Sequence, residues 1–245
     1  MNKDTYGILF DCERCIGCNA CAMACKAEFN WPEGNFAVKV NPVERGIFPK
    51  VEKNFVREAC MHCTEAACMM VCPVGAISKL PNGITFLDES KCIGCQYCPV
   101  NCPFHIPQFN KKIEKSFKCN LCEHLTSQGK EPACVATCIT GALTYGKIDE
   151  LQEKGREILA SKGTSQSLYG ESFLKGTHVF YALAKDPEMY ALNKDPKVPF
   201  SVILWKKYIQ PLGTFGILGA VLAAMAHYLI VGPKKEKKEE VHNDG

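Results

Sequence analysis

Short apolar runs near both ends of the first 150 residues predict β-structure. Residues 6–10 and 142–145 read as two strands. Residues 77–80 and 84–87 are two further short runs on either side of Asn82-Gly83, a step that is typical of a β-hairpin turn. Over residues 147–162, apolar side chains recur at partly helical spacing and predict a helix.

One long apolar run, residues 212–231, predicts a membrane-spanning helix. It carries no charge, and at about 1.5 Å of rise per residue it covers the roughly 30 Å of bilayer hydrocarbon. Lysine pairs at 206–207 and 234–235 flank it, with aromatic side chains near its ends. A buried core helix is the alternative, but the length, the missing charge and the flanks together favour the membrane.

The segments between these runs read as loops. Residues 26–59 are rich in proline, glycine and aromatic residues and predict a surface loop or an extended arm. Residues 161–199 are also loop-like. We therefore expect four regions: a domain over 1–149, a linker or extension with a partial helix over 150–200, an anchor helix over 201–232, and a charged tail over 233–245.

Composition excludes several classes of protein. With 47% hydrophobic and 22% charged residues, the chain is neither disordered nor collagen-like. A net charge of +3 gives no case for a nucleic-acid partner. The unusual feature is the 17 cysteines, all of which lie between Cys12 and Cys138. An odd number weighs against a fully paired disulfide framework.

The cysteines form four repeated motifs that leave only Cys12 unassigned. The first and third share the spacing Cys-x2-Cys-x2-Cys-x3-Cys, and the other two have a lengthened loop. The members are Cys15, Cys18, Cys21 and Cys25; Cys60, Cys63, Cys68 and Cys72; Cys92, Cys95, Cys98 and Cys102; and Cys119, Cys122, Cys134 and Cys138.

This spacing is typical of proteins that bind two [4Fe–4S] clusters. Three closely spaced cysteines wrap one cluster, and the fourth begins a helix that points toward the neighbouring cluster. Gly17 and Gly94 let the backbone approach the cluster sulfurs. Structural zinc is the main alternative, although three cysteines in succession fit paired zinc knuckles poorly. We expect Cys12 to be a small buried residue or a free thiol.

No catalytic constellation is visible. The chain has no phosphate-binding loop and no glycine-rich dinucleotide motif. We read His62 as a donor near the second motif, and His227, inside the predicted span, as an interfacial anchor rather than a haem or quinone ligand. The expected role is therefore electron transfer without catalysis.

The motifs resemble the four-cluster iron–sulfur subunits of molybdopterin oxidoreductases. The resemblance rests on residues 14–18, 60–63, 72–76 and 132–135, and the C-terminal pieces at 176–179, 205–206, 227–228 and 232–233 are similar to the beta subunit of membrane-bound formate dehydrogenase. Two departures are Ile139, where proline is usual, and His124-Leu125, where an arginine is common. Neither departure removes a cysteine.

The resemblance implies an α+β fold of two nested ferredoxin-like units, with loop insertions and one C-terminal transmembrane helix. It implies four [4Fe–4S] clusters, with motifs one and four paired and motifs two and three paired; the hairpin at 77–87 supports the second pairing independently. The implied ligands are Cys15, Cys18, Cys21 and Cys138 for cube 1; Cys119, Cys122, Cys134 and Cys25 for cube 2; Cys60, Cys63, Cys68 and Cys102 for cube 3; and Cys92, Cys95, Cys98 and Cys72 for cube 4.

The resemblance also implies partners and a location. The partners would be a catalytic subunit with a molybdenum or tungsten pterin, a membrane cytochrome b-type subunit that reduces quinone, and the lipid bilayer. The cluster domain would be periplasmic and the tail cytoplasmic; lysines on both sides of the span are too evenly divided to settle this. The rivals are the same role in a membrane hydrogenase or polysulfide-type reductase, and a metal-stabilised scaffold without redox activity.

Overall fold

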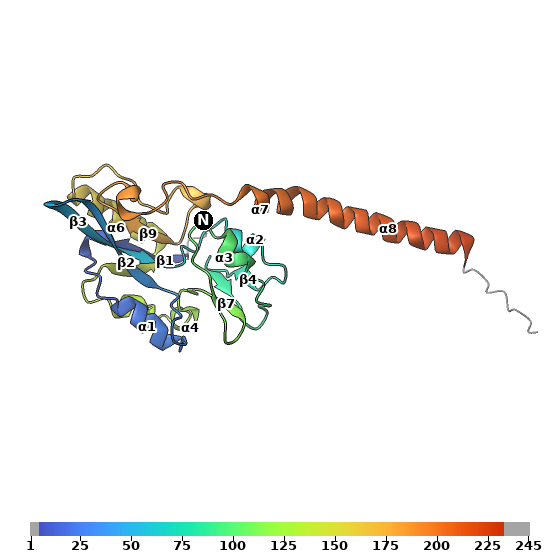
Figure 1. Cartoon of the computed structure of the whole chain (residues 1–245), viewed down its shortest axis with the longest axis horizontal. Coiled ribbons are helices and arrows are strands. Elements are labelled where there is room, and N and C mark those ends of the chain that lie inside the picture. Colours follow the sequence, from blue (N-terminus) through green and yellow to red (C-terminus); the bar gives the residue numbers. More distant parts are fainter. Residues whose placement is uncertain (1–4, 233–245) are drawn as a thin grey trace, which may run out of the picture. The chain divides into compact units, whose positions relative to one another are not determined.

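The computed structural model describes residues 5–232, which divide into two compact units (Figure 1). The first unit extends to Val202 and contains every cysteine, and the second begins at Ile203.

A three-stranded sheet connects the two ends of the first unit. Its central strand β1 (Tyr6–Asp11) pairs antiparallel with β8 (Leu143–Lys147) and parallel with β9 (Val179–Ala182). The predictions of strands at 6–10 and 142–145 are confirmed. β1 is almost fully buried because both faces of the sheet are covered, which is why its sequence is a continuous apolar run.

Helix α6 (Ile148–Ser161) covers one face of the sheet and confirms the predicted helix. Its buried face packs on Leu9 and Phe180, which point to this side of β1 and β9. Ile8 and Phe10 alternate to the other side and enter the larger core.

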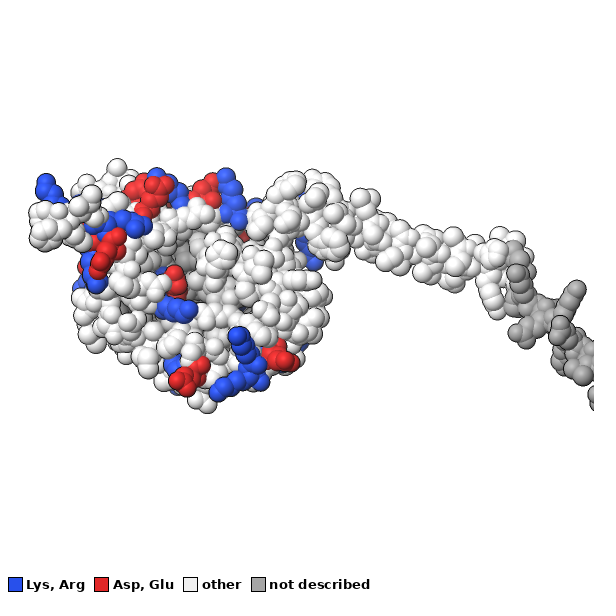
Figure 2. Space-filling view, viewed as in Figure 1, with Lys and Arg blue, Asp and Glu red and all other residues white. Residues whose placement is uncertain are grey.

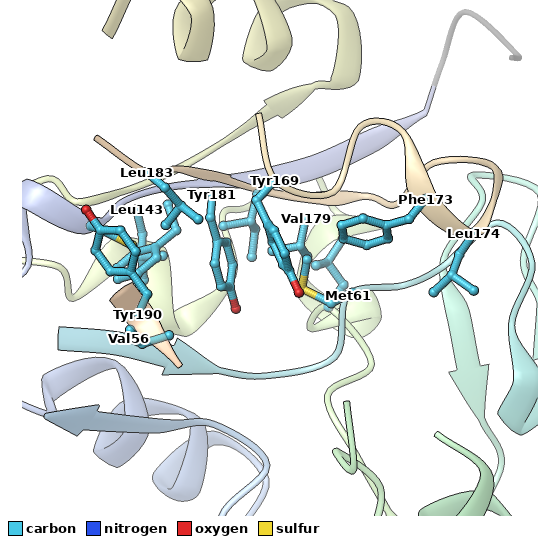
Figure 3. Packing of buried hydrophobic residues seen from close by; sticks show 14 of the residues in the cluster. Val56, Met61, Leu143, Tyr169, Phe173, Leu174, Val179, Tyr181, Leu183 and Tyr190 are labelled. Carbon is cyan, nitrogen blue, oxygen red and sulfur yellow. The ribbon is translucent and has the colours of Figure 1, made fainter. Parts of the chain in front are cut away.

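The larger core contains a row of aromatic side chains (Figure 3). The ring of Tyr169 lies 5.8 Å from that of Tyr181 and 4.8 Å from that of Phe173, measured between centroids. Figure 3 shows side chains from β3, β8 and β9 meeting in this layer, with Val56, Leu143 and Val179 among them.

Residues 150–200 form an extension of the first unit rather than a linker. α6 packs on the sheet, and β9 extends the sheet beside β1, so this segment belongs to the first unit. The expected loop character of 161–199 is wrong at β9, where four consecutive residues are buried.

Of the two alternatives for residues 26–59, the structure shows an extended arm rather than a loop. Most of it is a long antiparallel hairpin, β2 (Lys39–Ile47) and β3 (Lys50–Glu58), which pairs Lys39 with Glu58 at its base and Ile47 with Lys50 at its tip. The smaller predicted hairpin is confirmed as β4 (Ile77–Lys79) and β5 (Thr85–Leu87). A third, unpredicted hairpin joins β6 (Gln108–Asn110) to β7 (Lys115–Phe117).

Short helices follow the cysteine loops and carry several of the cysteines. They are α1 (Ala20–Glu28), α2 (Ala67–Met70), α3 (Tyr97–Asn101), α4 (Glu123–Thr126) and α5 (Ala133–Ala136). Across motifs, α1 packs against α5 and α2 packs against α3. The paired motifs are therefore one with four and two with three.

From Phe200 the chain is helical almost to the end of the described residues. α7 (Phe200–Leu204) passes through a π-helical turn at Trp205–Ile209 into α8 (Gln210–Val231). Residues Phe200–Ile230 are long and apolar enough to cross a membrane, and α8 contains no charged side chain (Figure 2). α8 begins two residues before the predicted apolar run 212–231, and the continuous helix from Phe200 agrees with the expected anchor over 201–232. The predicted charged tail lies outside the described residues.

Candidate iron–sulfur centres

The first and third cysteine motifs fold into loops of the same conformation. Gly17 and Gly94 both have φ of 72°, and two residues later Asn19 and Gln96 have φ of 58° and 60°. Each loop then enters a short helix, α1 or α3. The repeat in cysteine spacing is thus also a repeat in backbone structure.

Both glycines are required for steric reasons as well as for their positive φ. A Cβ on Gly17 would lie 2.3 Å from the ring of Phe55, and one on Gly94 would lie 2.2 Å from the carbonyl oxygen of Glu114. These contacts come from the β2–β3 and β6–β7 hairpins. Each hairpin therefore packs closely against a cysteine loop, and only glycine fits at the point of contact. The sequence did not reveal this constraint.

The second and fourth motifs share a different loop conformation. His62 and Leu121 occupy equivalent positions, with φ of 49° and 54°. The His62 backbone N–H donates to Cys60 Sγ at 3.5 Å, and the Leu121 N–H donates to Cys119 Sγ at 3.4 Å. Backbone donors of this kind stabilise a metal-bound thiolate and tune the potential of a cluster.

Two small cavities in the first unit are each lined by four cysteines. In each cavity three cysteines come from one motif and the fourth comes from its paired motif. Cys60, Cys63, Cys68 and Cys102 line one cavity, and Cys92, Cys95, Cys98 and Cys72 line the other.

The first and fourth motifs exchange cysteines in a similar way. The thiols that affect the Cys25 thiol electrostatically all belong to the fourth motif. Those that affect Cys15 include Cys138, the last cysteine of the fourth motif. The neighbours are Cys119, Cys134 and Cys122 for Cys25; Cys138 and Cys18 for Cys15; and Cys134 and Cys15 for Cys21.

The buried thiols hold their protons tightly unless a positively charged group binds to them. Burial, followed by the adjacent thiols, raises the pKa of Cys68 to about 12. Burial likewise raises the pKa of Cys122 to about 12 and that of Cys119 to about 11. A coordinated metal ion removes such protons outright, so these positions fit thiolates bound to metal.

The arrangement is unlike a site for one ion. Among residues 5–232, no three side chains of His, Cys, Asp or Glu converge closely enough to hold a single metal. Structural zinc draws four sulfurs to about 2.3 Å from one centre. A cluster instead offers a separate iron to each thiolate, so its ligands can stand further apart.

Two lysines lie near these thiols, Lys118 buried and Lys79 half-buried, and sequence reasoning identified neither. Lys118 is 2% exposed, and its Nζ donates to the carbonyl oxygen of Cys119 at 2.8 Å and to that of Thr85. The Nζ of Lys79 donates to the carbonyl oxygen of Gly83 at 2.9 Å. Carbonyl partners hold both ammonium groups in place.

Cys12 lines neither of the two four-cysteine cavities, although Cys15 is close enough to act on its thiol electrostatically. Cys12 is 4% exposed and packs in the larger core with Ile8 and Phe10. Burial raises its pKa well above the usual range, which suits the expected buried thiol. His227 lies within α8.

Comparison with known proteins identifies the family. A model of the 4Fe–4S dicluster domain matches residues 51–148, and a second model of that description matches residues 14–76. A model described as formate dehydrogenase N, transmembrane, matches residues 198–240. The formate dehydrogenase iron–sulfur subunit of Haemophilus influenzae is 40% identical, covering 96% of this chain and 83% of the relative. The chain belongs to the family of formate dehydrogenase iron–sulfur subunits.

Two further relatives show which part of the chain is shared beyond the formate dehydrogenases. The iron–sulfur subunit of the nitrate-inducible formate dehydrogenase of Escherichia coli K12 is 38% identical over 96% of this chain and 89% of its own length. The thiosulfate reductase electron transfer subunit PhsB of Salmonella typhi is 43% identical, but over only 59% of this chain and 77% of its own length. Full-length similarity is thus found with the formate dehydrogenase subunits.

Membership of this family confirms the expected iron–sulfur chemistry. It also confirms the α+β ferredoxin-like fold with a C-terminal membrane-spanning helix. The dicluster domains indicate more than one [4Fe–4S] cluster. The number of clusters and the ligands of each stay predictions.

Proposed function

We propose that this chain carries electrons through four [4Fe–4S] clusters in a membrane-bound formate dehydrogenase. The donor would be a catalytic subunit with a molybdenum or tungsten pterin, and the acceptor a membrane cytochrome b-type subunit that reduces quinone. When bound, the clusters supply one-electron redox chemistry, which no side chain of this protein provides by itself.

The observation that supports the proposal best is the exchange of cysteines between paired motifs. Each of two cavities combines three cysteines of one motif with the last-placed cysteine of its partner. Exchange of this kind holds two neighbouring clusters within one folded unit. The same exchange around Cys25 and Cys15 supports a second pair, and hence the ligand sets of cubes 1 to 4 given above.

The C-terminal helix supports formate dehydrogenase over the other candidate partners. The relative from thiosulfate reductase covers 59% of the chain, whereas the match to the formate dehydrogenase transmembrane model extends over residues 198–240. We also propose that the cluster unit is periplasmic and the C-terminus cytoplasmic. Labelling of single cysteines added at either end of α8 in intact cells would contradict this orientation if the C-terminal site reacted from outside.

Serine substitutions test the ligand sets in the assembled complex. Serine is a poorer ligand than cysteine because its hydroxyl is less acidic. We expect Cys72→Ser and Cys95→Ser to disturb one component of a redox-titrated EPR spectrum, and Cys102→Ser and Cys63→Ser to disturb a different one.

Each result of this test has a definite meaning. If Cys63→Ser and Cys72→Ser disturbed the same component, each motif would close its own cluster and the proposed exchange would be wrong. Isolation of the complex also identifies the large subunit that accompanies the chain. A hydrogenase or a sulfur-compound reductase in that position would overturn the proposed partner.

A further inference from the structure

Arg57 is a buried cation without a carboxylate partner. It lies near the end of β3, is 1% exposed, and takes part in none of the ion pairs found among residues 5–232. Burying an unpaired charge is costly, so a buried arginine normally has an anion beside it. Within the described chain that anion is missing.

The groups around the guanidinium are thiols of the first and fourth motifs. Its Nη2 lies 3.8 Å from Cys134 Sγ, and Cys119 and Cys21 are also close enough to act on it electrostatically. Burial works to lower the pKa of Arg57, but Cys134, Tyr181 and Cys119 raise it overall, so the group stays charged. Two of its nitrogens, Nε and Nη1, are buried without a hydrogen-bond partner in the described structure.

The strand that carries Arg57 is fixed against the cysteine loops. Phe55, two residues earlier and so on the same face of β3, packs on Gly17 of the first loop. The hydroxyl of Tyr181 donates to the carbonyl oxygen of Arg57, and Figure 3 shows this ring in the aromatic row beside Tyr169. The guanidinium is thereby held between the two motifs.

Lys118 and Lys79 provide a contrast within the same unit. The Nζ of Lys118 is held by the carbonyl oxygens of Thr85 and Cys119, and the Nζ of Lys79 by that of Gly83. Arg57 has no comparable set of oxygen acceptors: its guanidinium contacts Cys134 Sγ and the Tyr181 hydroxyl, and Nε and Nη1 have no hydrogen-bond partner in the described structure. Its free donors and its charge are thus available to groups bound at the cysteines.

We propose that Arg57 is the shared counter-ion of the two clusters held by the first and fourth motifs, and that its charge raises the reduction potential of both. This inference rests on the proposed function, because it assumes that cubes 1 and 2 are present. A cluster with four thiolates is negatively charged and gains a further negative charge on reduction. A fixed cation in a poorly screened interior therefore favours the reduced form.

Substitution of Arg57 by Met tests the role of the charge, because Met is long, flexible and neutral. The assembled complex is analysed for iron and by redox-titrated EPR. We expect two of four components to become harder to reduce, with the ratio of reduced to oxidised cluster at a fixed potential falling about tenfold, which corresponds to about 59 mV. The other two components keep their potentials.

Two more variants make the result specific. Arg57→Lys keeps the charge and should restore most of the lost potential. Arg156→Met removes the same charge from an exposed pair with Glu171, where solvent screens it, and should shift no component. Unchanged potentials in Arg57→Met, or an equal shift of all four components, would overturn the proposal.

Failure of Arg57→Met to load iron is also decisive. If Arg57→Lys then loads all four clusters, the charge itself is required, as a counter-ion should be. If Arg57→Lys fails as well, the residue acts through its shape and the proposal is wrong. An unaltered protein that lacked four EPR components would instead contradict the proposed function, and that result is seen before any variant is made.

Discussion

Arginine in place of Leu222 should expel α8 from the membrane. Leu222 lies about 18 Å along the helix from Gln210 and about 14 Å from Val231, at 1.5 Å per residue, so it falls near the middle of the span. Residues 210–230 of α8 are all exposed in the described chain. An arginine there would therefore meet lipid with no protein group of the described chain to cover it.

The size of the effect follows from insertion energies. Leucine at the centre of a membrane helix contributes about −0.3 to −0.6 kcal/mol, whereas arginine costs about 2.5 to 3.5 kcal/mol. Leu222→Arg should therefore cost about 3 kcal/mol or more, which lowers the ratio of inserted to non-inserted helix at least about a hundredfold. Gln210→Arg is the matched control, because a long side chain at the end of the helix can reach the interface.

The assay uses the full chain synthesised in the presence of membrane vesicles and then extracted with alkaline carbonate. We expect the original chain and Gln210→Arg to stay with the vesicles and Leu222→Arg to be released. Equal retention of the two arginine variants would refute the reasoning, because insertion would then not depend on the depth of the charge.

Two further predictions concern the first unit. Cys12→Ser should leave the iron content and all four EPR components unchanged, since Cys12 packs in the core; loss of about four irons per chain would mean that the first motif has been misread. Burial lowers the pKa of His178 to about 4 despite a backbone contact with Tyr6 that raises it. Because the usual value is 6.5, the folded state holds fewer protons than the unfolded state between these values, and stability falls as the pH drops from about 6.5 toward 4. His178→Gln should reduce the loss of unfolding free energy between pH 7 and 5 by about 2 kcal/mol in denaturant titrations, and parallel pH profiles for the two proteins would contradict this.

The sequence predicted the cysteine loops well because their structure is local. The spacing of the first and third motifs fixes a short loop before a helix, and the equal φ values at Gly17 and Gly94 follow from that. The hairpin around Asn82-Gly83 was also predictable, because its turn and its strands lie within eleven residues, 77–87.

The β2–β3 hairpin was predicted only as a loop or an extended arm, because its strands carry no clean alternation. β2 contains Pro42, which is unusual inside a strand, and most residues of both strands are at least partly exposed. β9 was missed for another reason. Its apolar run Val179–Ala182 is only four residues long and pairs in parallel with β1, about 170 positions earlier in the chain, so no neighbouring strand and turn identify it as part of a sheet.

The β2–β3 and β6–β7 hairpins matter for function because they pack against the cysteine loops. Loops with the same cysteine spacing therefore have different neighbouring side chains. The first and third motifs have the same loop conformation, yet β3 lies over the first and brings Arg57 and Phe55 to it, whereas the β6–β7 hairpin presses on the third through a backbone carbonyl. Reduction potentials depend on the charge and the donors around a cluster as well as on its ligands. Contacts from segments outside the motifs can therefore give clusters in similar loops different potentials, and β3 supplies the one buried arginine found among the described residues.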